Sequence, residues 1–165
     1  MKSELDILAG HSSIAGVKPI NEDCAGTYVP EEAYLLDHKG VVIAVADGVS
    51  SAEAGKEASH TSIERFLNEY YKTPDTWSVA KSGQNVLSAL NLHLYRKSHE
   101  FELDCKGYLT TFSAVIVKGH TAHFFHVGDS HIYHLRGEKL KLCTADHSAP
   151  LGEGRTFLSR AIGMD

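Results

Sequence analysis

The alternation of hydrophobic and polar positions divides the chain into an apolar strand, two amphipathic helices and a series of short strands. Residues 41–46 are a β-branched apolar run, Val-Val-Ile-Ala-Val-Ala, that stops at Asp47 and Gly48. This run predicts a strand that is buried on both faces and leads into a turn. The turn at Asp47 is therefore the first place to look for chemistry.

Helical spacing begins soon after this turn. Ser50 and Glu53 are spaced as in a capping box, and apolar residues then recur at intervals of three and four, which predicts a helix over about residues 52–71. A proline breaks the pattern, and a second amphipathic helix is predicted over residues 77–94. Gly83 is expected to weaken the first half of this second helix.

The period changes to that of strands in the last third of the chain. Strands are predicted over residues 110–117, 120–127, 130–135 and 139–143, with short turns at 118–119, 128–129 and 136–137. These turns predict an antiparallel meander of hairpins. A strand, two helices and then hairpins form an α+β order, in which helices cover an antiparallel sheet or sandwich.

Composition and charge narrow the classes of function. The 165 residues are 42% hydrophobic and 22% charged, which suits one globular domain over residues 1–165. The net charge of -5, without a basic stripe, argues against nucleic acid or an anionic membrane as a partner. Cys24, Cys105 and Cys143 lack metal-binding spacing, so free thiols and a cytoplasmic location are expected, with no membrane contact by this segment.

Three acidic positions could carry chemistry. They are the Glu22-Asp23 doublet, Asp47 at the end of the apolar strand, and Asp129 in a glycine turn. Taken singly, each has an ordinary explanation, because acidic doublets are usually solvated and Asp is common in turns for conformational reasons. Their combination is more informative than any one of them.

Five blocks in a fixed order make the sequence resemble the metal-dependent protein phosphatase family, type 2C. The blocks are KPINED (18–23), AVADG (44–48), TTFSA (110–114), HVGDSHIY (126–133) and LCTADHS (142–148), and LSRAIG (158–163) is similar to the next family block. The resemblance is closer still to bacterial members in which this module precedes a protein kinase on the same polypeptide. It covers nearly the whole chain.

The resemblance implies a β-sandwich of two antiparallel sheets flanked by helices, in α-β-β-α layers, with a binuclear Mn²⁺ or Mg²⁺ centre at one end. Asp47 would bridge the two metals, and the Gly48 carbonyl would bind one of them. Glu22 and Asp23 would ligate directly or through water, and Asp129 would serve an additional weaker site. Hard divalent cations prefer such oxygen ligands.

Lys18 and Asp47 are the expected catalytic residues. Lys18 stands where the family usually has a phosphate-binding arginine, although lysine lacks the bidentate fork of arginine. Asp47 would help the metals to activate water for in-line attack on phosphoserine or phosphothreonine in proteins. The family supplies further metal-binding aspartates after the LSRAIG block, so the domain is expected to be C-terminally incomplete and weakly active or inactive by itself.

Other mechanisms fit less well. Two histidine pairs, His123 with His126 and His131 with His134, are three residues apart in predicted strands, where they face opposite sides and cannot chelate one zinc ion. No cysteine is followed by the arginine of a cysteine-based phosphatase, and no P-loop occurs. The alternative is a phosphatase-like binding or regulatory module without catalysis. A phosphorylated protein is the expected partner, with a protein kinase as a second.

Overall fold

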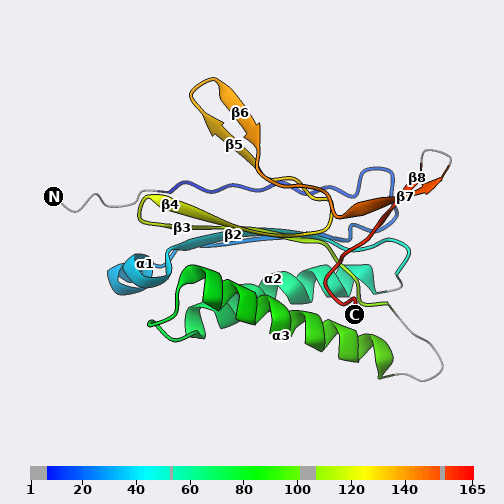
Figure 1. Cartoon of the computed structure of the whole chain (residues 1–165), viewed down its shortest axis with the longest axis horizontal. Coiled ribbons are helices and arrows are strands. Elements are labelled where there is room, and N and C mark those ends of the chain that lie inside the picture. Colours follow the sequence, from blue (N-terminus) through cyan, green and yellow to red (C-terminus); the bar gives the residue numbers. More distant parts are fainter. Residues whose placement is uncertain (1–6, 53, 101–106, 153–154) are drawn as a thin grey trace.

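The computed structural model describes residues 7–52, 54–100, 107–152 and 155–165. An antiparallel four-stranded sheet lies at its centre, in the order β1-β2-β3-β4 (Figure 1). Its strands are β1 (Asp23–Tyr28), β2 (Val41–Asp47), β3 (Phe112–Lys118) and β4 (Thr121–Val127). The helices are α1 (Ala33–Lys39), α2 (Gly55–Lys72) and α3 (Val79–His99), and α2 and α3 cover one face of the sheet (Figure 1). The α+β class with antiparallel sheets is thus confirmed.

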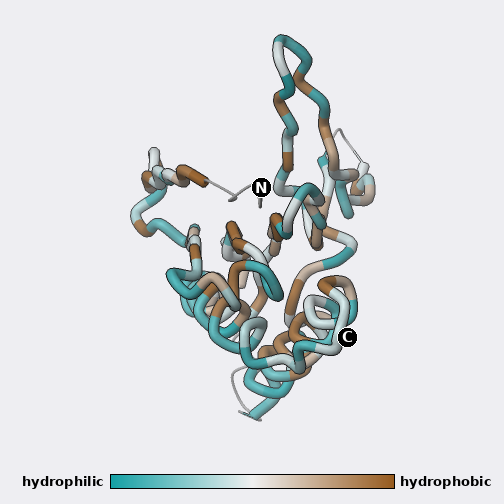
Figure 2. Tube along the Cα trace, turned by 90° about the vertical axis from the view of Figure 1, so that its left-hand side faces the viewer, coloured by the Kyte–Doolittle hydropathy of each residue, from teal (hydrophilic) through white to brown (hydrophobic). Residues whose placement is uncertain are grey.

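Two short hairpins complete the described chain. They are β5 (Tyr133–Arg136) with β6 (Lys139–Leu142), and β7 (Ser148–Gly152) with β8 (Arg155–Leu158). Neither hairpin joins the four-stranded sheet. The β5–β6 hairpin projects from the body of the molecule, and all eight of its strand residues are exposed (Figures 1 and 2).

The sheet has a covered face, which packs on α2 and α3, and a far face on its other side. Residues on the covered face are small or apolar and buried, as Ala44, Ala114 and Ile116 show with exposures of 2%, 1% and 0%. They pack against Phe66 of α2 and Leu90 of α3 in one hydrophobic core. The helices thus supply the second layer that this face of the sheet needs.

Burial on both faces was correctly predicted for Val41 and Val42, which are both 0% exposed, but was wrong at Val45. Ala44 and Ala46 are buried on the covered face, but Val45 points to the far face and is 42% exposed. The apolar run does form β2, with nearly the predicted bounds. Hydrophobicity alone did not reveal that helices cover only one side of it.

Glycine 83 has a packing role that the prediction of a weakened helix missed. A Cβ added at Gly83 would lie 2.3 Å from Cζ of Phe125 in β4. The missing side chain therefore lets α3 approach the sheet closely, and the helix runs through this position without a break. Ser78 caps α3 by accepting a hydrogen bond from the Lys81 backbone N–H at 3.2 Å.

The predicted capping box is not formed at α2. The helix begins at Gly55 after Ala54, which offers no side-chain cap, and Ser50 instead accepts a hydrogen bond from Lys18. Glu53, the other half of the predicted box, lies outside the described residues. The Ser50 side chain therefore does not cap the first backbone N–H groups of α2.

The turn at 128–129 is not the hairpin that the sequence predicted. Within the described residues, β4 pairs with β3 alone and β5 with β6 alone, so the chain leaves the sheet at Gly128. The pattern also missed β1, α1 and the β7–β8 hairpin. β1 is a six-residue strand with a central glycine, and α1 has only seven residues, so neither element shows a clear hydrophobic period.

A buried lysine fixes the start of β2. Lys39 is 2% exposed, and its ammonium group donates hydrogen bonds to the Thr73 hydroxyl at 2.9 Å and the Pro74 carbonyl at 3.2 Å. It also lies 3.6 Å from the carboxylate of Asp75. These contacts tie the α2–α3 connection to the beginning of β2. Among the described residues, no helix has the length and apolar character needed to cross a membrane.

Candidate active site

Two aspartates face each other across the first two strands. The antiparallel register pairs Asp23 of β1 with Asp47 at the end of β2, so their side chains share the far face. The closeness of the two carboxyl groups also contributes to a raised pKa of Asp47. We call Asp23 and Asp47 the carboxylate pair.

The environment of this pair disfavours two negative charges. Burial, the hydrogen bond with Asp23 and the charge of Asp23 raise the pKa of Asp47 from 3.8 to about 6, and the charge of Asp129 adds to the rise. Lys18 acts in the opposite direction. Carboxyl groups that share a site and repel each other are stabilised by a bound cation.

The backbone of Asp47 is held on both sides by a threonine pair. Its carbonyl accepts hydrogen bonds from the Thr111 N–H at 2.8 Å and the Thr110 hydroxyl at 2.9 Å. Its N–H donates to the Thr111 hydroxyl at 3.0 Å. Both threonines are buried, so these bonds fix the position from which the Asp47 carboxyl projects.

Gly48 and Glu22 lie next to the carboxylate pair, where the N-terminus of α2 approaches. The Gly48 N–H donates to the Glu22 carbonyl at 3.1 Å. A Cβ added at Gly48 would lie 2.3 Å from the Gly55 carbonyl oxygen, so only glycine allows this close approach of the turn and α2. Glu22 and Gly48 therefore stand beside the pair, and their role as metal ligands stays a prediction.

Lys18 lies at the rim of the site and is already engaged. Its ammonium group donates a hydrogen bond to the Ser50 hydroxyl at 2.7 Å and lies 3.8 Å from the Glu22 carboxylate. Half of its side chain is exposed. Lys18 is close enough to influence Asp47 electrostatically and still reaches solvent.

A cavity of about 240 Å³ opens beside the carboxylate pair, and we call it the carboxylate cavity. It is lined by Ser12, Ser13, Asp23, Cys24, Ala25, Val45, Ala46, Asp47 and Ser130. Ser130 comes from the turn after β4, so residues far apart in the sequence meet here. The neighbouring Asp129 contributes charge to the site.

The predicted metal ligands are not gathered into one cluster. Over the part of the chain that the structure describes, no group of three or more His, Cys, Asp or Glu side chains could hold a metal ion. The structure brings Asp23 and Asp47 together, with Glu22, Gly48 and Asp129 around them. Within these residues the carboxylate pair offers two ligands, which is fewer than Mn²⁺ or Mg²⁺ requires.

Three hydroxyl groups at this site, those of Thr110, Thr111 and Ser130, were not among the predicted site residues. Their positions depend on the pairing of distant segments, which no local pattern reveals. The family-like blocks at 110–114 and 126–133 were the available signal, because they contain all three residues. The structure shows that these blocks meet at Asp47.

The histidines near the site serve other contacts. His126 Nδ1 is 2.9 Å from the Ser113 hydroxyl, and its ring stacks on His147 with centroids 5.1 Å apart. His131 Nε2 lies 2.8 Å from a carboxylate oxygen of Asp146. These side chains therefore hold the segment that follows β4 against the sheet and the β5–β6 region.

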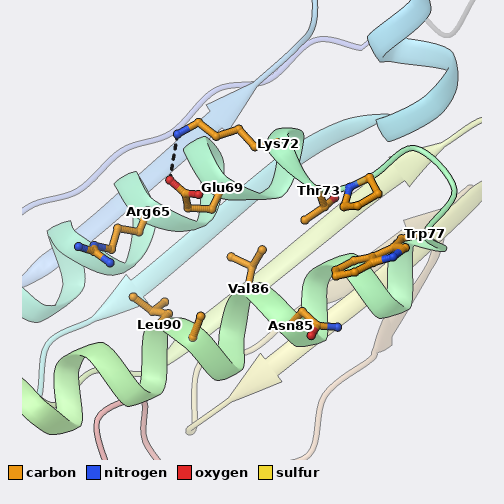
Figure 3. Close-up of a pocket in the computed structure, with 10 residues that line it drawn as sticks. Arg65, Glu69, Lys72, Thr73, Trp77, Asn85, Val86 and Leu90 are labelled. Carbon is orange, nitrogen blue, oxygen red and sulfur yellow. Dashed lines mark hydrogen bonds and ion pairs between the residues drawn. The ribbon is translucent and has the colours of Figure 1, made fainter.

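A second cavity, of about 260 Å³, lies between α2 and α3 (Figure 3). Trp77, Val86 and Leu90 give it an apolar lining, and Arg65 stands at its edge. Among its lining residues, Lys72 forms an ion pair with Glu69 at 2.9 Å. This second cavity lacks the facing carboxyl groups of the carboxylate cavity, so we assign the chemistry to the latter.

Comparison with known proteins identifies the family of this chain. The family model described as "Protein phosphatase 2C" matches residues 31–162. A "Serine/threonine phosphatase stp" of Listeria monocytogenes serovar 1/2a is 31% identical over 137 residues, with coverage of 78% of this chain and 49% of the relative. A protein of the same name from Listeria innocua is 29% identical over 137 residues. The chain spans about half the length of the curated relatives it matches.

Solved structures share the fold. Serine/threonine phosphatase Stp1 from Staphylococcus aureus has a TM-score of 0.72 at 20% identity, covering 90% of this chain and 62% of that one. The serine/threonine phosphatase PstP/Ppp from Mycobacterium tuberculosis has a TM-score of 0.63 at 26% identity, covering 80% of this chain and 51% of that one. Since the family model matches most of the sequence and the fold agrees, the chain belongs to the protein phosphatase 2C family.

Proposed function

We propose that the protein hydrolyses phosphoserine and phosphothreonine in other proteins, using Mn²⁺ or Mg²⁺ and an activated water. The observation that carries this proposal is the carboxylate pair, in which Asp23 and Asp47 face each other in a cavity and the pKa of Asp47 is raised to about 6. Membership of the family and relatives named serine/threonine phosphatases support it. Residues 1–165 would be the N-terminal part of one phosphatase domain.

The residues around the cavity suit hard divalent cations in type, since they offer carboxylate and carbonyl oxygens. Asp47 would hold both ions, Asp23 and the Gly48 carbonyl would each contribute a ligand, and Glu22 would act directly or through water. Asp129 would serve an additional site. When bound, the ions would orient the phosphate and lower the pKa of a water molecule. Further ligands would come from water and from protein outside these residues.

The protein groups have separate tasks in this proposal. The threonine pair keeps the Asp47 carboxyl in place, and the raised pKa of Asp47 reflects a site that would favour a bound cation. Lys18 would supply a positive charge at the rim for the incoming phosphate, weakened by its contacts with Ser50 and Glu22. We therefore expect Lys18 to affect substrate binding more than the chemical step.

A phosphorylated protein is the proposed substrate, and a protein kinase that phosphorylates the same targets is the proposed counterpart. The kinase could reside on the same polypeptide, as the sequence resemblance predicts. Cys24 and Cys143 are free thiols in the structure, which supports work in the reducing cytoplasm. Cys105 lies outside the described residues.

The decisive test is phosphate release from a phosphothreonine peptide by the protein at its full natural length. We expect hydrolysis with Mn²⁺, none after chelation, and a loss of at least about a hundredfold in kcat for Asp47→Asn, since a misplaced or missing metal ligand removes transition-state stabilisation. Glu138→Gln, on the exposed turn between β5 and β6, is the matched control. Phosphopeptide binding without any hydrolysis would instead establish a binding or regulatory module.

A further inference from the structure

A chain of hydrogen bonds joins the backbone of Asp47 to the turn after β4. The Asp47 N–H donates to the Thr111 hydroxyl at 3.0 Å, and that hydroxyl lies 2.9 Å from the Ser130 hydroxyl. Asp47 and Ser130 both line the carboxylate cavity. The Thr111 hydroxyl therefore connects two residues that line the same cavity, Asp47 and Ser130.

The direction of this chain follows from donor and acceptor chemistry. A backbone N–H can only donate, so the Thr111 oxygen accepts from Asp47. Thr111 is 2% exposed, and its hydroxyl proton needs an acceptor, which the Ser130 oxygen provides. Donation from Thr111 to Ser130 is the direction that satisfies the buried Thr111 proton, and it leaves the Ser130 proton free for another partner.

The position of Ser130 is also fixed by packing. Gly128 has a φ of +113°, and a Cβ added there would lie 2.6 Å from the Thr111 methyl carbon. The turn can rest on Thr111 only because Gly128 has no side chain. Thr111 consequently places Ser130 through its methyl group and its hydroxyl together.

Ser130 lines a cavity whose other polar lining includes the carboxylate pair. Among the described residues, Thr111 is the one hydrogen-bond partner that the structure gives to the Ser130 hydroxyl. A neutral donor complements a phosphate oxygen without adding a charge that would compete with a metal ion. Ser130 reaches the cavity from the segment after β4, while the carboxylate pair reaches it from β1 and β2.

We propose that Ser130 donates a hydrogen bond to the phosphate group bound in the carboxylate cavity, and that Thr111 is the positioning residue that aims it. This assignment rests on the proposed function, because it takes phosphate as the ligand of the cavity. It adds a phosphate-contacting residue from the turn after β4 to a site otherwise built from β1 and β2.

Inorganic phosphate is the probe, titrated by calorimetry into the full-length protein saturated with Mn²⁺. Ser130→Ala should weaken phosphate binding about tenfold, which is the loss expected for one hydrogen bond to a charged group, and Ser130→Thr should restore most of it. Ser88→Ala, on the exposed surface of α3, should bind phosphate like the wild type. With p-nitrophenyl phosphate, Ser130→Ala should also raise KM more than it lowers kcat.

Two variants separate the tasks of Thr111, one without its hydroxyl and one without its methyl group. Thr111→Val keeps the packing against Gly128 but removes both hydrogen bonds, so it should weaken phosphate binding about as much as Ser130→Ala and speed amide exchange at Asp47. Thr111→Ser keeps the hydroxyl and should bind phosphate within about threefold of the wild type. Thr121→Val, at an exposed position of β4, controls for the substitution itself.

The outcomes distinguish this inference from the proposed function. Hydrolysis with unchanged phosphate affinity in Ser130→Ala would overturn the role of Ser130 and leave the phosphatase activity standing. Phosphate binding that depends on Ser130, in a wild-type protein that hydrolyses nothing, would overturn the activity and leave this assignment standing. A loss in Thr111→Ser with none in Thr111→Val would show that packing, and not the hydroxyl, aims Ser130.

Discussion

The two faces of the four-stranded sheet differ in burial and in chemistry, although they alternate along the same strands. On the covered face, Val42 and Phe112 are fully buried beneath α2 and α3. On the far face, Val45 and Phe124 are 42% and 43% exposed. The carboxylate pair lies on the far face. The hydrophobic core and the candidate active site are therefore on opposite faces of the sheet.

This separation means that a substitution's effect should depend on its face more than on its residue type. Burial of apolar area stabilises the covered face, while the far face offers space for ions and ligands. Matched substitutions on opposite faces therefore test the comparison directly.

The largest expected effect comes from a pair of phenylalanines in neighbouring strands. Phe112→Ala should lower the free energy of unfolding by about 3–5 kcal/mol, because Phe112 is fully buried and packs on Phe66 with ring centroids 4.8 Å apart. Phe124→Ala on the far face should cost about 1 kcal/mol or less. Urea denaturation measures both, and equal losses would contradict the difference between the faces.

Close packing of α3 on the covered face gives the next effect. Gly83→Ala should destabilise the protein by about 1–3 kcal/mol, because the new methyl group would collide with the ring of Phe125. Helix propensity alone predicts the opposite sign, since alanine favours a helix over glycine by about 1 kcal/mol. Gln84→Ala, at the next and exposed position of α3, should be neutral or slightly stabilising in the same thermal melts.

Two valines of β2 allow the same substitution on both faces. Val42→Thr places a hydroxyl in the core and should cost about 1–3 kcal/mol, whereas Val45→Thr should change stability by less than about 0.5 kcal/mol. Chemical denaturation of the two variants gives the comparison within a single strand. A larger loss at Val45 would mean that another part of the protein covers the far face.

The smallest effect concerns the carboxylate pair itself, in protein freed of metal by a chelator. The folded-state pKa of Asp47, about 6, lies above the ordinary 3.8, so its favourable contribution is present at low pH and is lost as the pH rises through about 6. Asp47→Asn cannot ionise and should be more stable than the wild type by about 1 kcal/mol at about pH 8, a value reduced for partial exposure of Asp47.

At about pH 4 the same variant and the wild type should have similar stability, because Asp47 is then protonated. Urea denaturation at both pH values measures the difference. Glu138→Gln, an exposed substitution of the same kind, should show no such pH dependence. A stabilisation of Asp47→Asn that is equal at both pH values would exclude ionisation of Asp47 as its cause.

Much of the fold could be predicted because its strongest elements have clear periods. The apolar run of β2 and the long amphipathic α2 and α3 were found with bounds close to the observed ones. The faces of β2 were not, because a run of apolar residues gives no indication of which side the helices take. Short elements such as α1 were not predicted, because seven residues are too few to show a clear hydrophobic period. The departure of the chain from the sheet at Gly128 was not predicted either, because it depends on contacts with Thr111, which is distant in sequence.

The candidate site was predicted in its residue types but not in its arrangement. Asp47 stood out by its place after an apolar strand, while Asp23 became convincing only through family resemblance. Their direct opposition depends on the β1–β2 register, and the link to Ser130 depends on a third strand. The metal and phosphate roles of these residues stay predictions that the experiments above can decide.

The fixed length of β2 has a consequence for insertions and deletions. Lys39 anchors one end of the strand in the α2–α3 connection, and the threonine pair holds the other end at Asp47. Loss of one residue between these anchors would turn the carboxyl of Asp47 toward the helices, since strand side chains alternate between faces. Loss of two would restore the face but shift the carboxyl by about 7 Å along the strand. Length changes in homologous sequences should therefore fall in the loops and avoid the interval between Lys39 and Asp47.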